Sequence, residues 1–253
     1  MASDSRLHQT VEALLQRLSA ASGVALEDLA PLEALLRTRL RAAPARTDLG
    51  EEGEPASGLR VILSGWASRY KLLGNGKRQL LGFLLPGDIC DAYMHWLARM
   101  DHSIGTLTDV IYADLRRDEA ERLIADHPAI ARALWVQTLM DIGAQREWTV
   151  SLGQRVAFQR LAHLFFDVHL RLRGVGLTNG NRCDFPATQV DIGDAAGLSP
   201  VHVNRTLQDL RAAGLITLSH RRLDIRSLPE LRAAAMLHPS YPACMAPHLA
   251  LTI

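Results

Sequence analysis

The chain has 253 residues, of which 48% are hydrophobic, and its formal net charge is +1 at neutral pH. This length suggests one or two domains, each able to bury a core. The balanced charge excludes an overall positive field, so a nucleic-acid interface would have to gather its cations on one face. The start of the chain has no apolar core typical of a signal peptide, and no run of about 18 apolar residues predicts a membrane span. We therefore expect a cytoplasmic protein that does not contact membranes.

The sequence contains none of the common motifs of enzymes and metal sites that we searched for. Cys90, Cys183 and Cys244 are widely spaced and form no C-x-x-C pair, which predicts reduced thiols. There is no Gly-rich phosphate loop, no G-x-S-x-G and no H-E-x-x-H. Asp88 and Asp91 could form a carboxylate pair, but Asp after Pro-Gly is ordinary turn chemistry. The interpretation we favour is that the protein is not an enzyme and carries no cofactor or metal.

The N-terminal part of the chain begins with a helical pattern. Residues 7–40 are expected to be helical, because Val11, Leu14 and Leu18 recur on one face at spacings of three and four. Residues 41–58 are rich in Ala, Pro, Glu and Gly, which predicts a loop or a poorly ordered connection.

Short apolar segments separated by glycine turns follow. Residues 61–63, 66–73 and 79–85 are predicted strands. Asn75-Gly76 favours a tight hairpin, because this pair readily supplies positive φ angles. The third strand runs into Pro86-Gly87-Asp88. These units predict a small antiparallel barrel or jelly roll.

From about Arg117 the periodicity becomes helical. Trp135, Leu139 and Ile142 lie on one stripe, with Val136 and Met140 beside it, a wide apolar surface that suggests a helix shared with a partner chain. A second amphipathic helix is predicted up to Gly174, followed by a polar loop over 174–186. Its apolar face consists of Leu161, Leu164, Phe165, Val168 and Leu172.

The segment from Thr188 onwards predicts a helix-turn-helix. Thr188 can cap a first helix, with Asp191 completing the capping box. Gly197 stands where a left-handed residue is needed, and Ser199 and Pro200 suit the cap and first position of a second helix. Two short capped helices joined by a glycine turn form this motif.

The second helix has one apolar and one polar side. Val203, Leu207 and Leu210 repeat at helical spacing and are expected to be buried. The other side could read base edges in the major groove, with Arg205 bidentate to guanine and Val201 against a thymine methyl. The candidate base-reading residues are Val201, His202, Asn204, Arg205 and Gln208.

A basic hairpin follows this helix. Residues 215–218 and 223–225 are predicted strands of a wing, joined by a turn with three cationic or titratable side chains. Such side chains hold phosphates, which position a protein without specifying sequence. The candidate phosphate contacts are Thr188, Ser199, His220, Arg221 and Arg222. Two alternatives stay open: Arg205 could be a surface salt-bridge partner, and the protein could be a sensor or adaptor that acts through protein contacts.

The order of these residues resembles the Crp/Fnr family of regulators. The resemblance is specific over Asp191-Ile192-Gly193, Gly197-Leu198-Ser199, Val203-Asn204-Arg205 and Gly214-Leu215-Ile216, with Leu207 and Leu210 between them. Ser64-Gly65, Asn75-Gly76 with Lys77-Arg78-Gln79, and Pro86-Gly87-Asp88 resemble the family's sensor barrel.

The resemblance implies an α+β architecture. It implies a cyclic-nucleotide-binding-like β-barrel (jelly roll) within residues 1–125, a long dimerisation helix over 126–151, a winged helix-turn-helix over 152–237 and a tail over 238–253. It also implies a homodimer, paired along Trp135, Leu139 and Ile142, on palindromic promoter DNA, with RNA polymerase as a further partner.

The sequence departs from the family at several places. The family's Arg-Glu pair after the serine is replaced by Pro200 and Val201, so the half-site is expected to differ. After Gly87-Asp88 no Arg-Ala or Arg-Ser pair follows, and Arg99 is a poor substitute, so cAMP and cGMP are not expected to bind.

Other sensor chemistry is also not expected. No cysteine precedes Cys90, which argues against the N-terminal iron–sulfur cluster of the oxygen-sensing branch. Haem would need His95 or His102 as an axial ligand, and lone histidines are seldom ligands. A redox switch at Cys90 is not favoured either. The effector stays unknown.

Overall fold

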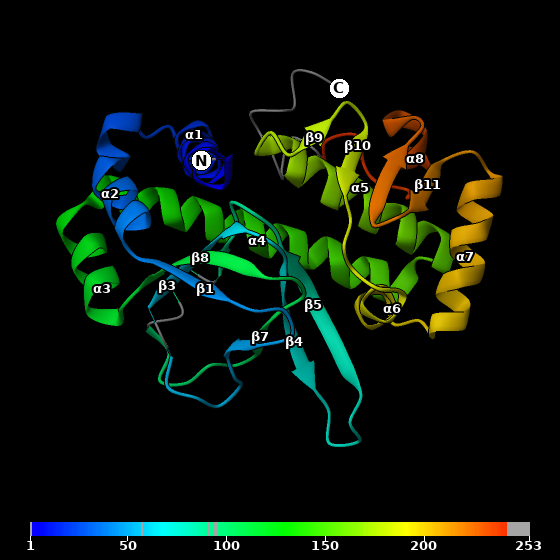
Figure 1. Ribbon diagram of the computed structural model, residues 1–253, viewed down its shortest axis with the longest axis horizontal. Coiled ribbons are helices and arrows are strands. Elements are labelled where there is room, and N and C mark those ends of the chain that lie inside the picture. The colour runs from blue at the N-terminus through cyan, green and yellow to red at the C-terminus, as the bar shows by residue number, and fades with distance from the viewer. Residues whose placement is uncertain (1, 57, 91, 94–95, 242–253) are drawn as a thin grey trace. The chain divides into compact units, whose positions relative to one another are not determined.

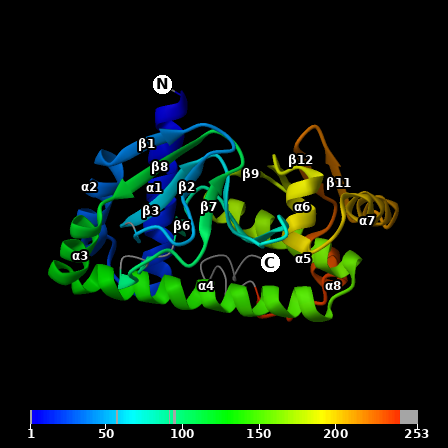
Figure 2. The ribbon, with the colours of Figure 1, turned by 90° about the horizontal axis from the view of Figure 1, so that it is seen from below.

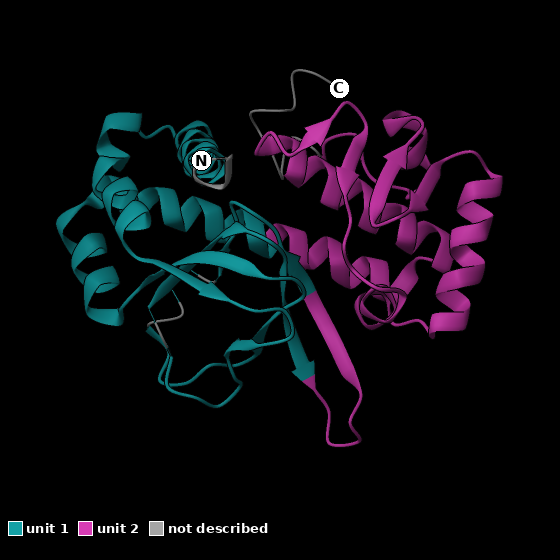
Figure 3. Ribbon diagram, viewed as in Figure 1, with its two compact units in different colours: residues 1–71, 82–142 teal, residues 72–81, 143–253 magenta. Residues whose placement is uncertain are grey.

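The computed structural model describes residues 2–56, 58–90, 92–93 and 96–241. The chain forms two compact units (Figure 3): unit 1 contains residues 1–71 and 82–142, and unit 2 contains residues 72–81 and 143–253. Among the described residues, no helix is both long enough and apolar enough to cross a membrane.

Unit 1 holds the N-terminal helices and two sheets (Figure 1). The described residues of the N-terminal part form eight strands, β1 to β8, whereas the sequence predicted three, and the first strand starts at Leu40. The elements in chain order are α1 (Ala2–Ser22), η1 (Leu26–Leu29), α2 (Ala30–Thr38), β1 (Leu40–Ala43), β2 (Asp48–Gly50), β3 (Leu59–Ser64), β4 (Ala67–Leu72), β5 (Arg78–Leu84), β6 (Ile89–Cys90), β7 (Ser103–Thr106), β8 (Val110–Leu115), α3 (Arg117–Asp126) and α4 (Pro128–Gln154).

Two expectations for the N-terminal part are wrong. The single helix over 7–40 is broken after Ser22, because Gly23 adopts a φ of +70° and ends α1. The loop expected over 41–58 contains β1 and β2. In β1, Leu40 pairs with Ala113 of β8, and its side chains are largely exposed, so this edge strand has no alternation of polar and apolar residues to reveal it.

The strands form two four-stranded sheets, ordered β1-β8-β3-β6 and β2-β7-β4-β5. Ile62 and Val110 from the first sheet share a buried cluster with Ala67, Leu84 and Ile104 from the second. Apolar side chains from both sheets thus fill the interior of the predicted jelly roll. The predicted β-rich N-terminal domain, long helix and C-terminal helix-turn-helix are all present.

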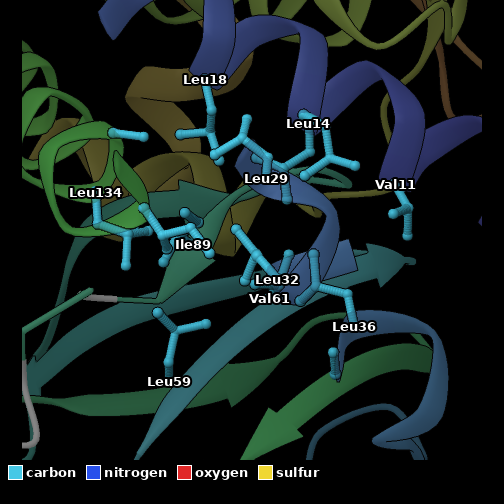
Figure 4. Close-up of a cluster of buried hydrophobic side chains, with 14 of the residues drawn as sticks. Val11, Leu14, Leu18, Leu29, Leu32, Leu36, Leu59, Val61, Ile89 and Leu134 are labelled. Carbon is cyan, nitrogen blue, oxygen red and sulfur yellow. The ribbon is translucent and has the colours of Figure 1, made fainter. Parts of the chain in front are cut away.

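The opposite face of the first sheet is covered by the N-terminal helices (Figure 4). Along β3, Leu59, Val61 and Leu63 join this cluster, whereas Ile62 between them joins the interior one, as the two-residue period of a strand requires. Burying each such Leu stabilises the fold by roughly 1.5–3 kcal/mol. The other labelled members are Val11, Leu14, Leu18, Leu29, Leu32, Leu36, Ile89 and Leu134.

The predicted Asn-Gly hairpin is present, but its turn is wider than expected. Gly76 has a φ of +80°, whereas Asn75 keeps a negative φ. Instead the Asn75 side chain accepts a hydrogen bond from the backbone N–H of Lys77 at 3.0 Å. The backbone closes between Leu73 and Lys77, so this loop is not the two-residue turn that needs two positive φ angles.

Unit 2 contains a helical layer and one small sheet. α4 is a single continuous helix of 27 residues (Figure 2), and its last turns belong to this unit. The later elements are α5 (Ala157–Gly174), β9 (Thr178–Asn179), β10 (Arg182–Asp184), α6 (Gln189–Ala196), α7 (Pro200–Ala212), β11 (Ile216–Ser219), β12 (Arg222–Ile225) and α8 (Leu228–Ala234).

The α5 helix and the wing are confirmed, and one loop is corrected. All five predicted apolar residues of α5 are buried, and Phe165 packs against Phe185 with ring centroids 5.2 Å apart. The loop expected over 174–186 contains β9 and β10, which extend the wing into a sheet ordered β11-β12-β10-β9. Strands of two and three residues are too short to show a period.

Candidate nucleic-acid interface

The helix-turn-helix is held by its two caps. At the start of α6, Thr188 Oγ1 accepts a hydrogen bond from the Asp191 backbone N–H at 3.2 Å, and Asp191 Oδ2 accepts one from the Thr188 N–H at 2.9 Å. At the start of α7, Ser199 Oγ accepts from the His202 N–H at 3.3 Å, with Pro200 in the first turn. Both caps satisfy N–H groups that no helix carbonyl can reach.

The turn between the helices depends on two glycines for different reasons. Gly197 ends α6 with a φ of +64°, the left-handed region in which glycine is not strained. Gly193 is required for steric reasons instead, because a Cβ atom there would lie 2.5 Å from the carbonyl oxygen of Leu198. The Leu198 N–H in turn donates to the Gly193 carbonyl at 3.0 Å. The close approach of α6 to the turn therefore requires a residue without a side chain.

α7 has the predicted buried and exposed sides. Val203, Leu207 and Leu210 are buried in unit 2. All five candidate base-reading residues are exposed: Val201, His202, Asn204, Arg205 and Gln208. Val201 is 81% exposed. The Gln208 side-chain amide donates to Asn204 Oδ1 at 3.1 Å, which orients two amides side by side on this surface.

The tip of the wing is a strained two-residue turn. His220 and Arg221 have φ values of +49° and +60°, both in the left-handed region, and the flanking Ser219 and Arg222 are paired. Two positive φ angles in a two-residue hairpin define a type I′ turn, which usually contains Asn or Gly. The Phe185 N–H donates to the Arg221 carbonyl at 2.7 Å and helps to hold this conformation. His220, Arg221 and Arg222 are all exposed.

Two shallow hollows connect these elements within unit 2. One, of about 330 Å³, lies between α7 and the wing and brings together Asn204, Gln208, His220 and Arg221. The other, of about 430 Å³, lies between the exposed side of α7 and Gln189 at the start of α6. Arg205 and Val201 line only this second hollow.

The sequence reasoning missed Gln189 and Arg211. Gln189 lines both hollows, and Arg211 lines the hollow beside the wing. Gln189 is the first residue of α6, directly after the predicted cap Thr188, and could have been found from that position. Arg211 lies one turn beyond Gln208 and could have been found from helical spacing.

The thiols and histidines considered as sensor groups lie only in part among the residues that the structure describes. Cys90 and Cys183 are both buried, and burial raises the pKa of the Cys183 thiol to about 12, so it stays protonated. His102 lies with Nδ1 2.7 Å from Asp101 Oδ1. No cluster of three or more His, Cys, Asp or Glu side chains suited to a metal occurs in the described part of the chain. Asp91, His95 and Cys244 lie outside it.

The stripe predicted on the long helix is exposed. Trp135, Leu139 and Ile142 on α4 are 48%, 60% and 40% exposed. An aromatic group extends this surface in unit 1: the ring centroids of Trp135 and Tyr93 are 4.6 Å apart, and those of Trp135 and Trp96 are 6.2 Å apart. The sequence analysis did not find Tyr93 and Trp96, which are distant in the chain from α4.

Comparisons with known proteins agree with this geometry. The chain matches the cyclic nucleotide-binding domain over residues 40–127 and the Crp-like helix-turn-helix domain over residues 159–234. It is 27% identical to the transcriptional activator protein FnrL of Cereibacter sphaeroides, covering 78% of this chain and 79% of FnrL. It is also 27% identical to the nitrogen fixation regulation protein FixK of Azorhizobium caulinodans, covering 84% of this chain and 86% of FixK.

Among solved structures, FixK2 from Bradyrhizobium japonicum is 24% identical, with a TM-score of 0.69, over 77% of this chain and 96% of that one. This likeness supports the same fold. Taken with the two matched domains and the relatives named as transcriptional activators, the chain belongs to the Crp/Fnr family of DNA-binding transcription regulators.

Proposed function

We propose that the exposed side of α7 enters the major groove of promoter DNA and reads its bases. The observation that carries this proposal is the exposed Arg205 in the middle of α7, on the side opposite the buried Val203 and Leu207. A guanidinium there can donate two hydrogen bonds to guanine O6 and N7. His202, Asn204 and Gln208 supply further donors and acceptors beside it.

Phosphate contacts would fix the orientation of α7. Arg221 and Arg222 at the wing tip are exposed, and Arg222 lies 3.6 Å from Asp184 in a solvated pair that DNA phosphates can replace. His220 shares the turn. Thr188 and Ser199 begin the two helices, where the helix dipole and free N–H groups favour an anion.

Two copies of the chain would pair along α4. Trp135, Leu139 and Ile142 present an apolar stripe that a second copy can bury. A twofold dimer presents two α7 helices to successive major grooves about one DNA turn apart, which requires palindromic half-sites. RNA polymerase is the partner through which such a regulator changes transcription, and the cytoplasm is where it meets promoters.

The barrel is proposed not to respond to cAMP or cGMP. Arg99, the first arginine after Gly87-Asp88 in the sequence, is exposed and donates to the Gly53 carbonyl at 2.7 Å. A buried phosphate would need a guanidinium and free N–H groups as partners. Isothermal titration is expected to detect no cAMP binding, and micromolar affinity would contradict this part of the proposal.

The central experiment identifies the DNA site and then removes Arg205. Mapping of the fragments bound by the purified protein gives the half-site, and fluorescence anisotropy measures its affinity. Arg205→Ala is expected to weaken specific binding by about 1–3 kcal/mol. Arg122→Ala on α3 removes the same charge from an exposed residue paired with Asp118, and it should bind like wild type.

The alternative is a sensor that acts through protein contacts alone. In that case Arg205→Ala and wild type bind the same duplex equally, at the level of random DNA. Arg205 makes no ion pair among the described residues, which argues against its interpretation as a surface salt-bridge partner.

A further inference from the structure

We infer that α6 and α7 form a notch that reads the C5-methyl group of a pyrimidine, so that each half-site requires thymine, or equally 5-methylcytosine, at one position. The notch consists of Gln189 at the start of α6 and Pro200, Val201 and Asn204 on α7. This inference rests on the proposed entry of α7 into the major groove.

The first observation is an apolar side chain in an exposed position. Val201 is 81% exposed, more than any other large apolar side chain in the described part of the chain. Pro200 beside it is also exposed and adds a second apolar surface. The C5-methyl of thymine is the apolar group that the major groove offers, and contact removes both methyl surfaces from water.

The second observation is the shape of the surface around Val201. The hollow of about 430 Å³ is formed by two helices, with Gln189 on the α6 side and Val201, Asn204 and Arg205 on the α7 side. A methyl group placed in this shallow hollow lies beside side chains from both helices.

The third observation is the kind of polar groups that line the hollow. Gln189, Asn204 and Gln208 are neutral amides, and Arg205 is the sole charged residue of the lining. An amide can donate to the O4 of thymine or accept from the N4 of cytosine, so it discriminates poorly between these groups. A carboxylate would favour cytosine, and none lines the hollow. Discrimination therefore falls on the methyl group.

The position of Val201 also constrains the half-site. N-terminal residues of a recognition helix reach the base edges, and Arg205 lies four residues further along, about 6 Å on the helix axis. The methyl-bearing pyrimidine and the guanine read by Arg205 are thus expected about two base pairs apart, given the spacing of roughly 3.4 Å per base pair.

The test uses duplexes that differ by one methyl group. In the half-site found by selection, each thymine is replaced in turn by uracil, which lacks only the C5-methyl. At one position per half-site, binding is expected to fall by about 4-fold, the effect of one buried methyl group. At that position, with guanine opposite, cytosine is expected to bind as weakly as uracil, and 5-methylcytosine as strongly as thymine.

Two variants assign the effect to Val201. Val201→Ala is expected to bind the thymine and uracil duplexes within 2-fold of each other while remaining folded, because the Val201 side chain is 81% exposed in the free protein. Val190→Ala removes the same atoms from a valine on α6 that is 52% exposed and outside the hollow, and it should keep the wild-type difference.

The outcomes separate the two proposals. Specific DNA binding by wild type with no position sensitive to the methyl group would overturn this inference and leave the proposed function intact. A methyl effect that persists in Val201→Ala would also overturn it. Failure of the wild type to bind any duplex specifically would overturn the proposed function, and this inference with it.

Discussion

Arg78 Nη2 donates a hydrogen bond to Asp191 Oδ1 at 2.9 Å, although the two residues are 113 positions apart in the chain. The Asp191 side chain is 1% exposed, and its other oxygen accepts from both the N–H and the hydroxyl of Thr188. Arg78 Nε also donates to Asp194 Oδ2 at 2.8 Å. One buried carboxylate therefore joins the hairpin 72–81 to the cap of α6 within unit 2.

We predict that Arg78→Ala lowers the free energy of unfolding by about 1–3 kcal/mol, because it removes a charged hydrogen-bond donor from the buried Asp191 carboxylate. Urea unfolding followed by circular dichroism measures the change. Lys77→Ala is the matched control, because Lys77 is the residue next to Arg78 and its side chain is exposed. Equal stabilities for the two variants would contradict a stabilising role for the Arg78 contact.

The two glycines of the turn predict different sensitivities to the same substitution. In Gly193→Ala the new Cβ would lie 2.5 Å from a backbone oxygen, so the turn must move, and we expect a loss of at least about 3 kcal/mol together with loss of DNA binding. In Gly197→Ala the nearest atoms are 3.6 and 3.8 Å away, so only the positive φ is unfavourable, at about 1 kcal/mol. Thermal unfolding of both variants should reproduce this order.

The sequence predicts the fold best where helix caps or regularly spaced apolar residues are present. The caps of α6 and α7 and the apolar face of α5 follow from local patterns, because the residues that interact are within one or two helical turns. Edge strands such as β1 and β9 are not predictable in this way. Their stability comes from pairing with residues far along the chain, and their own side chains are exposed or too few to form a pattern.

The same limit applies to the candidate site. The exposed side of α7 follows from helical spacing, but the role of Gln189 depends on how α6 crosses α7. The link between Arg78 and Asp191 requires knowledge of which hairpin reaches the α6 cap. The turn at His220 and Arg221 is a different case, because arginine seldom adopts a positive φ and the contact from Phe185 that holds Arg221 is distant in sequence.

The wing arginines are predicted to affect affinity differently from Arg205. Arg221→Ala or Arg222→Ala should each reduce the slope of log K against log salt concentration by about 1, because one phosphate contact is lost. The relative affinities for different sequences should stay the same. Anisotropy titrations between about 50 and 200 mM salt measure the slope. An altered base preference in either variant would indicate that the wing reads bases.

The α4 stripe is predicted to hold a dimer. Leu139→Glu places two carboxylates near each other across the twofold axis and removes apolar contact, so we expect monomers and weak DNA binding. Light scattering coupled to size exclusion measures the mass. Leu26→Glu, at a leucine that is 51% exposed and distant from α4 in the chain, is the control. A dimeric Leu139→Glu protein would show that another surface pairs the chains.

Two buried histidines of α5 predict how stability depends on pH. Burial lowers the pKa of both His163 and His169 to about 4. His163 is satisfied, with Nδ1 3.1 Å from Ser151 Oγ and Nε2 3.2 Å from Tyr241 Oη. His169 is fully buried, and neither of its ring nitrogens has a hydrogen-bond partner among the described residues. The buried imidazole of His169 therefore destabilises the folded state, and the packing of α5 must offset this loss of free energy.

His169→Leu is predicted to raise the free energy of unfolding by about 1 kcal/mol near pH 7, because it removes two buried polar atoms without partners. The gain should grow as pH falls. In the unfolded chain His169 has the ordinary histidine pKa of about 6.5, whereas in the folded chain its pKa is about 4. Between these two pH values only the unfolded chain binds the proton, so the folded wild type loses stability as the pH falls. The variant lacks this histidine and therefore loses less stability over the same range. Urea unfolding at pH 7.5, 6 and 5 measures both effects. His202→Leu, at an exposed histidine of α7, is the control, and equal pH dependence in His169→Leu and wild type would contradict the prediction.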